Sequence, residues 1–438
     1  MLKIAFLGAG SLGFGPRLVS DILSFPELTD SVIHLVDPAS ERLDFIESYV
    51  RRMVSEANLP TRIVASTGRK SALDGANYVI ASIRVGQYFG PETLDVMIPY
   101  EVGGLRQTVS DTVGVGGVMK GLRTIPPMLD IARDMERLCP KAILLNYTNP
   151  MAMIMWAINV ATKITSVGLC HSVQGTSQQL AGYMGVDYTR MRYHVAGINH
   201  MAWFLDLSTE GKDLYPRLKD CLNNPETFTK DPVRFEIMKH FGYFVTESST
   251  HMAEYVPYFM AHTEEMERLK IWSRAKENAL TEEVLAQRRE QHQKRLAEQQ
   301  KQLEEKPTAI VRSHEYAAAI IHAVETDSAI RINASVPNTG LITNLLQGCS
   351  VEVPCLIDGS GLHPCYVGAL PPQCASLCQG NVNMQGLTVQ AILEQKREYV
   401  YHAAMVDPNT SAQMTLPQIR ETMDRLIESQ RDMMPPLS

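Results

Sequence analysis

The fold is decided by the stretch KIAFLGAGSLG, residues 3–13. After Lys3, the next four residues are an apolar run typical of a buried strand, and the last six form a complete G-x-G-x-x-G motif before a helical pattern. Gly8 permits a tight turn, Gly10 lets the backbone approach a pyrophosphate, and Gly13 allows close helix–strand packing. With Ser11 in the same turn and a helix N-terminus beyond it, the stretch predicts a dinucleotide-binding turn.

A carboxylate stands where this kind of turn needs one. Asp37 directly follows the apolar run Val32–Val36, and an acid at the end of the second strand can accept hydrogen bonds from the adenosine ribose. Because a 2′-phosphate would meet a like charge there, Asp37 favours NAD over NADP. A chance cluster of glycines is the alternative, but the order of strand, glycines, helix and acid argues against it.

Short β-branched runs alternate with helical patterns through the first half of the chain. An amphipathic pattern over Glu41–Glu56 is one of the intervening helices. The alternation predicts an α/β fold, with a Rossmann-like doubly wound parallel sheet over residues 1–195. The expected strands are Lys3–Leu7, Val32–Val36, Ile63–Ser66, Tyr78–Ile83, Ala142–Asn146 and Thr165–Leu169.

The pattern changes after residue 195, where aromatic and methionine residues become frequent. The polar tract Glu282–Glu305 has too few apolar positions for a coiled-coil seam and predicts a solvated surface helix. Residues 196–438 are expected to form a C-terminal α+β domain for substrate binding and oligomerisation, packed continuously on the first. Its clearest expected elements are strands Ala329–Ser335 and Val351–Ile357 and helices Leu387–Asp407 and Leu416–Ser429.

Composition excludes several classes of protein. No apolar run in the 438 residues approaches the ~20 that a membrane helix needs. A formal net charge of −7 argues against nucleic-acid binding. The eight cysteines form no CxxC pair or compact framework, and the N-terminal apolar stretch is too short for a secretory signal. A cytoplasmic protein with reduced thiols is therefore expected.

Polar residues gather after later strands, where open α/β sheets bind ligands. They are Asn149, Cys170, His171 and the Asn199-His200 pair. A thiolate and an imidazole from separate loops suit Mn²⁺, Fe²⁺, Co²⁺ or Ni²⁺, and two protein ligands are too few for a structural zinc site. The alternative, a buried Cys packing as a small apolar residue and a hydrogen-bonded loop His, stays open on spacing alone.

A glycine-rich stretch, Ser110–Gly117, contains one acid, Asp111. It predicts a flexible loop that closes over substrate. A plain turn capped by the aspartate fits the same residues.

Together these motifs resemble glycoside hydrolase family 4, the NAD- and metal-dependent glycosidases. The similarity runs over nearly the whole chain, and within the family the chain most resembles the branch of melibiase-type α-galactosidases. The residues that carry it are Gly8–Gly13 with Asp37, Asp111–Gly117, Tyr147–Met151, Cys170–Gly175, Gly197–His200, Gly242–Ser249, Asn333–Asn338, Gly340, Val351–Pro354, Asp358 and His363-Pro364.

The resemblance implies a glycosidase outside the usual two-carboxylate scheme. In that family NAD⁺ takes a hydride from C3 of the sugar, which acidifies the proton at C2. A base removes that proton and the glycosidic oxygen leaves C1. Water then adds, C2 is reprotonated and the hydride returns, so the cycle is redox-neutral. A divalent cation, Mn²⁺ first with Fe, Co or Ni as alternatives, stabilises the enediolate.

Carried over by motif, Cys170 and His200 are the expected metal ligands. Asn149 and Asn199 are expected to contact the sugar. His171 is the expected acid that protonates the leaving oxygen.

The C2 base is expected in the window that holds Glu247, His251, Glu254 and Tyr255. Glu247 is preferred there, and its alternative role is that of a carboxylate that contacts the substrate or supports the residues that do. Asp111 is expected to support substrate or base.

A neutral α-galactoside is the expected substrate. An α-galacturonide or α-glucuronide is the near alternative, because a uronate needs a cationic partner and the sequence does not place Arg84, Arg106 or Arg123. A dehydrogenase of the malate or lactate type with net NADH production, and a catalytically silent NAD sensor, are alternatives of other classes. The family also implies a homodimer or homotetramer. The composition argues against nucleic acid or a membrane as a partner.

Overall fold

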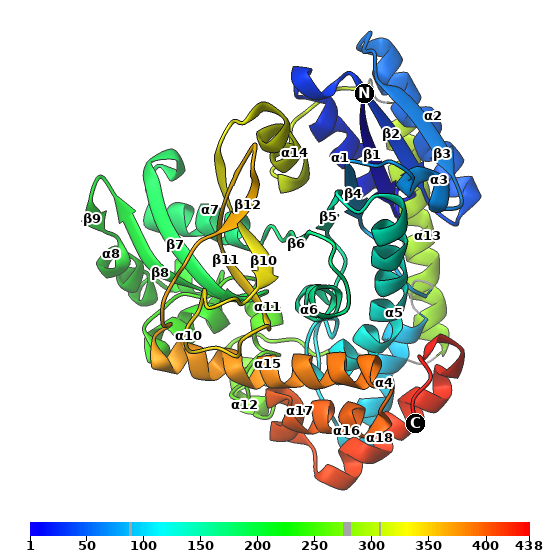
Figure 1. The fold of residues 1–438 in the computed structure, drawn as a ribbon. Coiled ribbons are helices and arrows are strands. Elements are labelled where there is room, and N and C mark those ends of the chain that lie inside the picture. Colours follow the sequence, from blue (N-terminus) through cyan, green and yellow to red (C-terminus); the bar gives the residue numbers. More distant parts are fainter. Residues whose placement is uncertain (87–89, 275–281, 306–307) are drawn as a thin grey trace.

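The computed structural model describes residues 1–86, 90–274, 282–305 and 308–438. Its described strands form one twelve-stranded sheet in the order β3-β2-β1-β4-β5-β6-β10-β11-β7-β8-β9, with β12 paired to β11 (Figure 1). The sheet is parallel at the N-terminal end of this order and antiparallel beyond β6, and the two regions are described in turn.

The parallel region confirms the predicted doubly wound sheet. All five neighbouring pairs from β3 to β6 are parallel, and the order 3-2-1-4-5-6 is that of a dinucleotide-binding fold. The strands are β1 (Leu2–Leu7), β2 (Ser31–Val36), β3 (Arg62–Ser66), β4 (Tyr78–Ala81), β5 (Ile143–Asn146) and β6 (Ser166–Gly168).

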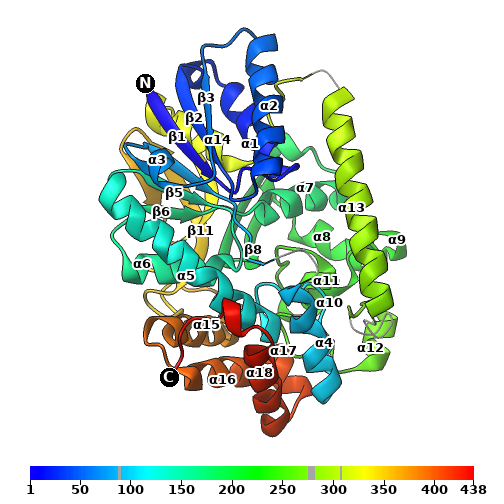
Figure 2. The same cartoon turned by 90° about the vertical axis from the view of Figure 1, so that its right-hand side faces the viewer.

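Helices cover both faces of the parallel region (Figure 2). On one side α1 (Phe14–Leu23) packs against α2 (Ser40–Glu56) and α14 (Tyr316–Thr326). On the other, α5 (Gly114–Leu138) packs against α3 (Lys70–Leu73) and α6 (Met151–Ala161). Because both faces are covered, the strands are almost continuously apolar, as the sequence pattern requires.

The antiparallel region adds the second half of the chain to the same sheet. Ser335 of β10 pairs with Gly168 of β6, and Glu352 of β11 pairs with Gly197 of β7. Residue 195 lies inside β7, so the sheet is continuous across the expected boundary. The strands are β7 (Met191–Ile198), β8 (Met201–Thr209), β9 (Lys212–Asp213), β10 (Ile330–Pro337), β11 (Ser350–Asp358) and β12 (Gly361–Pro364); β10 and β11 confirm two predicted strands.

One predicted helix, Leu387–Asp407, is wrong in its extent. It is the end of α15 (Pro372–Leu393) followed by α16 (Arg397–Val406). The chain turns at Gln395, whose φ of 56° cannot continue a helix. Asp407 instead caps the next helix by accepting a hydrogen bond from the Thr410 N–H.

The remaining described helices lie around the antiparallel region or pack with one another and with α16 in the C-terminal part of the chain. The predicted polar helix is α13 (Glu282–Glu305), which runs along one side of the molecule (Figure 2). Within the described residues, no helix has the length and apolarity to cross a membrane. The others are α4 (Pro91–Gly103), α7 (Ser172–Met184), α8 (Tyr215–Asp220), α9 (Pro225–Phe228), α10 (Pro232–Phe241), α11 (Ser249–Met252), α12 (Thr263–Arg268), α17 (Pro408–Gln413) and α18 (Leu416–Ser429).

Candidate active site

The glycine turn after β1 is shaped by a backbone carbonyl and a side chain that approach it very closely. Gly8 has φ +85°, and a Cβ there would lie 2.1 Å from the carbonyl oxygen of Ser82. A Cβ on Gly10 would lie 2.7 Å from Cγ of Asp37. Only glycine fits at these two positions, and the narrow backbone cradle they form before α1 suits a pyrophosphate.

Asp37 fastens this turn to the second strand. Its carboxylate accepts hydrogen bonds from the N–H groups of Gly10 and Ala39, both at 3.0 Å, and the residue is 6% exposed. The Ser11 hydroxyl accepts from the Phe14 N–H at 3.2 Å, which satisfies one donor at the start of α1. The contact of Asp37 with a ribose stays a prediction.

The packing role predicted for Gly13 is wrong. A Cβ on Gly13 would meet nothing within 4 Å, whereas one on Gly15 would lie 2.4 Å from the carbonyl oxygen of Ala9 and 3.4 Å from Ile46. The close approach of α1 to the turn therefore depends on Gly15. The sequence signal was present, since Gly15 stands two residues beyond the motif.

Cys170 and His200 come together beyond the ends of β6 and β7, and Glu247 joins them. One ligand atom of each lies within 4.8 Å of the other two. His200 Nε2 is 3.7 Å from Glu247 Oε2. Cys170 follows β6, His200 lies in the two-residue turn between β7 and β8, and Glu247 precedes α11. We call these three residues the Cys-His-Glu cluster.

The charges of the Cys-His-Glu cluster favour a cation. Burial lowers the pKa of His200, but Glu247 and Cys170 outweigh burial and raise it to about 10. Burial raises the pKa of Glu247, yet His200 and His251 outweigh it and hold that pKa well below its usual value. A thiolate, an imidazole and a carboxylate are a donor set for a borderline divalent cation, and a bound cation would replace the proton on His200.

His251 connects the Cys-His-Glu cluster to Asp111. Its Nδ1 is 3.6 Å from Glu247 Oε1 and its Nε2 is 3.6 Å from Asp111 Oδ1. The other oxygen of Asp111 lies 3.3 Å from the ammonium of Lys120. Sequence reasoning placed Asp111, Glu247 and His251 in the site but missed Lys120, which one lysine in a long helix does not reveal.

The prediction of a flexible glycine-rich loop over Ser110–Gly117 is wrong for the second half of this segment. Gly114–Gly117 form the first turn of α5, and the Gly114 N–H donates to Asp407 at 2.9 Å. The preceding turn is fixed by Glu254, whose carboxylate accepts hydrogen bonds from three consecutive N–H groups, those of residues 108, 109 and 110. Asp111 is thus presented by a rigid segment.

Two other residues in the window expected to hold the C2 base, Glu254 and Tyr255, are buried and hydrogen-bonded within the protein. Glu254 is 2% exposed and its oxygens are occupied by backbone donors. The Tyr255 hydroxyl lies 2.7 Å from Thr112 Oγ1, which is also 3.1 Å from His251 Nε2. Burial raises the pKa of Tyr255 well above its ordinary value. His251 and Tyr255 therefore share one hydroxyl partner beside Asp111.

The other predicted residues lie around this centre. Asn149 precedes α6, and its side-chain oxygen accepts from the Met151 N–H at 3.3 Å. Asn199 is 2% exposed and donates to Glu352, so its amide nitrogen is already engaged inside the protein. His171 has a side chain 64% exposed, with Nδ1 3.6 Å from Glu315 Oε1.

The three arginines left open by the sequence can now be placed. Arg123 is 2% exposed and pairs with Asp95 at 2.6 Å. Arg106 donates to the carbonyl oxygen of Met260 and to the Thr263 hydroxyl. Arg84 pairs with Glu92. Each guanidinium has a partner within the chain.

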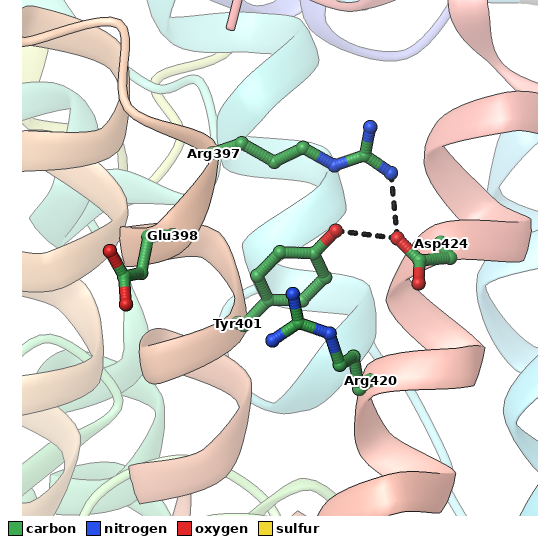
Figure 3. Close-up of a pocket in the computed structure, with 5 residues that line it drawn as sticks. All are labelled: Arg397, Glu398, Tyr401, Arg420 and Asp424. Carbon is green, nitrogen blue, oxygen red and sulfur yellow. Dashed lines mark hydrogen bonds and ion pairs between the residues drawn. The ribbon is translucent and has the colours of Figure 1, made fainter. Parts of the chain in front are cut away.

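A separate surface pocket lies between α16 and α18, with a volume of about 530 Å³ (Figure 3). Asp424 accepts hydrogen bonds from Arg397 and from the Tyr401 hydroxyl, and the Arg420 guanidinium lies 4.4 Å from the centre of the Tyr401 ring. None of the predicted site residues lines this pocket, which also includes Glu398.

Comparison with known proteins bears on nearly the whole chain. Residues 3–186 match the model of the family 4 glycosyl hydrolases, and residues 195–410 match that of their C-terminal domain. The chain is 40% identical to an α-galactosidase of Bacillus subtilis over 99% of both chains. It is 34% identical to an α-galactosidase of Rhizobium meliloti (99% and 89% covered) and 28% identical to an α-galacturonidase of Thermoanaerobacterium saccharolyticum (93% and 91%).

Solved structures share the fold. A 6-phospho-β-glucosidase of Thermotoga maritima, determined with manganese, NAD⁺ and glucose-6-phosphate, superposes with a TM-score of 0.79 at 20% identity over the whole of both chains. A malate dehydrogenase of Plasmodium falciparum superposes with a TM-score of 0.52 at 13% identity, covering 92% of this chain and all of the other.

Proposed function

The chain belongs to family 4 of the glycosyl hydrolases, and from this we propose that it hydrolyses α-galactosides with NAD and a divalent cation, Mn²⁺ first. The observation that carries the proposal is the Cys-His-Glu cluster, whose Cys170 follows β6 at the same edge of the parallel region as the glycine turn after β1, in a chain 40% identical to an α-galactosidase. A neighbouring structure's manganese and NAD⁺ support the choice of both groups.

Two sets of residues would hold these groups. Gly8, Gly10 and Ser11 cradle the pyrophosphate of NAD, with Asp37 at the ribose. Cys170, His200 and Glu247 hold the cation. When bound, NAD supplies a reversible hydride acceptor at C3 of the sugar, and the cation supplies a Lewis acid for charge that develops on the C2 and C3 oxygens.

The chain's own residues bind and move protons around this centre. Asn149 binds sugar hydroxyls. His171, exposed beside the cluster's Cys170, protonates the leaving oxygen. The low pKa of Glu247 makes it a poor base and a good ligand, so we assign it to the cation and not to removal of the C2 proton. Asp111 and His251 hold the charge balance behind Glu247.

The arginines favour a neutral sugar. A uronate would need a free guanidinium or ammonium at the site. Arg123 and Arg106 are engaged within the protein, and the Lys120 ammonium is paired with Asp111 and Glu92. Galacturonide hydrolysis is therefore the second candidate, kept because an α-galacturonidase is 28% identical to the chain.

The test is an assay of the protein with NAD⁺, Mn²⁺, a reductant and an aryl α-galactoside. Release of the aglycone without net NADH is expected. Stoichiometric accumulation of NADH would identify a dehydrogenase, and no reaction under any condition would leave the sensor alternative. Activity on an aryl α-galacturonide but not on the galactoside would replace the substrate.

Three further properties belong to the proposal. We assign residues 1–195 to cofactor binding and residues 196–438 to enclosing the sugar and to assembly as a homodimer or homotetramer. We place the protein in the cytoplasm, because all eight cysteines are free thiols in the structure and Cys170 must stay reduced to bind a metal.

A further inference from the structure

Glu352 is a buried carboxylate to which the reaction proposed above gives no role. It lies on β11 opposite Ser335 of β10 and Gly197 of β7, and it is 1% exposed. Its Oε2 accepts a hydrogen bond from Asn199 Nδ2 at 3.2 Å. Its Oε1 is buried and has no hydrogen-bond partner among the described residues. A buried carboxylate oxygen without a donor is destabilising and requires an explanation.

His200, the residue next to Asn199, has the complementary deficit. Its Nε2 faces Glu247, 3.7 Å away, whereas its Nδ1 is buried without a partner in the described part of the chain. A cation on Nε2 leaves the single proton of the neutral imidazole on Nδ1. That N–H donor then needs an acceptor inside the protein.

We propose that Glu352 accepts the Nδ1–H of His200 through one ordered water, and so positions the imidazole that binds the cation. The inference rests on the proposed metal site. A metal-bound histidine usually donates its second N–H to a carboxylate, a carbonyl or a water, and this bond fixes the tautomer and the ring orientation. Glu352 has one unpartnered acceptor among the described residues, Oε1, and its Oε2 is hydrogen-bonded to Asn199, the residue next to His200. The Glu352 carboxylate also interacts electrostatically with His200.

Glu352 also stabilises the backbone conformation of the segment that carries the His200 ring. His200 has φ +66°, in the left-handed region that a histidine seldom occupies. It is the second residue of the two-residue connection between β7 and β8. The bond from Asn199 to Glu352 anchors the first residue of that connection, which helps to hold the strained conformation at the second. Glu352 is therefore a positioning residue.

The test measures Mn²⁺ binding, by calorimetry in the presence of NAD⁺, for the wild type, Glu352→Met and Glu352→Gln. Methionine fills the space but accepts no strong hydrogen bond, so we expect Mn²⁺ affinity to fall about 10- to 100-fold. Glutamine keeps a neutral acceptor, and we expect about a fivefold loss. NAD⁺ affinity should be unchanged in both. Asp95→Asn, in a buried ion pair with Arg123, is the control: it should lower Tm without changing Mn²⁺ affinity.

Each outcome decides. A folded Glu352→Met that binds Mn²⁺ as tightly as the wild type overturns the positioning role. If circular dichroism shows that Glu352→Met does not fold, wild-type affinity in Glu352→Gln overturns it instead. A wild type that binds no Mn²⁺ refutes the proposed metal site itself, which is a distinguishable result.

Discussion

The glycine turn and the Cys-His-Glu cluster are the two halves of the proposed site, and they are built in different ways. The turn is a short run of backbone packed against two segments of the parallel region: Gly8 against the Ser82 carbonyl and Gly10 against the Asp37 side chain. The cluster is made of side chains from segments after β6, between β7 and β8, and before α11. The parallel region alone therefore completes the first half, whereas the second exists only once the antiparallel region has joined the sheet. Substitutions in one half are expected to leave the other intact.

The largest effect is expected from Cys170→Ser. Losing the thiolate removes a ligand of the cation, whose Lewis acidity is worth several kcal/mol, so kcat should fall roughly 1000-fold. NAD⁺ affinity, measured by fluorescence titration, should be unchanged. The matched control is Cys365→Ser, another partly exposed free thiol, located outside the cluster. Full activity of Cys170→Ser would remove the thiol from the metal site.

Glu254→Gln tests what holds Asp111 in place beside the Cys-His-Glu cluster. The amide group of a glutamine would place N–H groups against the backbone N–H donors of residues 108–110. Loss of these charge-assisted hydrogen bonds would leave buried donors unpaired, at a cost of about 1–3 kcal/mol in stability. We expect kcat to fall up to about 100-fold through displacement of Asp111, with Mn²⁺ and NAD⁺ affinities unchanged. A kcat equal to that of the wild type would show that the position of Asp111 does not matter.

Gly8→Ala tests the turn. The added methyl group meets the Ser82 carbonyl at 2.1 Å in a left-handed backbone, and about 2 kcal/mol of strain corresponds to roughly 30-fold weaker NAD⁺ binding, with Mn²⁺ affinity unchanged. Gly13→Ala is the matched control, because its methyl group meets nothing within 4 Å. Equal NAD⁺ titrations for the two variants would contradict the assigned roles.

The smallest effect is expected from Asp37→Ala. Removing the acceptor of the Gly10 N–H and of the ribose should weaken NAD⁺ about tenfold, while the Mn²⁺ concentration for half-maximal activity stays the same. A change in metal dependence with unaltered NAD⁺ affinity would refute the ribose contact.

The difference between the glycine turn and the Cys-His-Glu cluster also explains how much of the fold and the site the sequence could predict. The parallel strands, the glycine turn and Asp37 follow from local pattern, and the structure confirms their place in the fold. Gly15 took the packing role expected of Gly13 because the exact start of α1 is not encoded in the motif. Glu352 stands 152 residues after His200, and Glu254 bonds a turn far upstream of it; sequence spacing carries no sign of such pairings, which depend on strand order.

The redox-neutral elimination is the central claim, and deuterium labelling tests it most directly. An aryl α-galactoside is hydrolysed in D₂O with NAD⁺ and Mn²⁺, and the released galactose is examined by NMR. Removal and return of the C2 proton predicts deuterium at C2 of the product. Galactose released with ordinary hydrogen at C2 would contradict the mechanism.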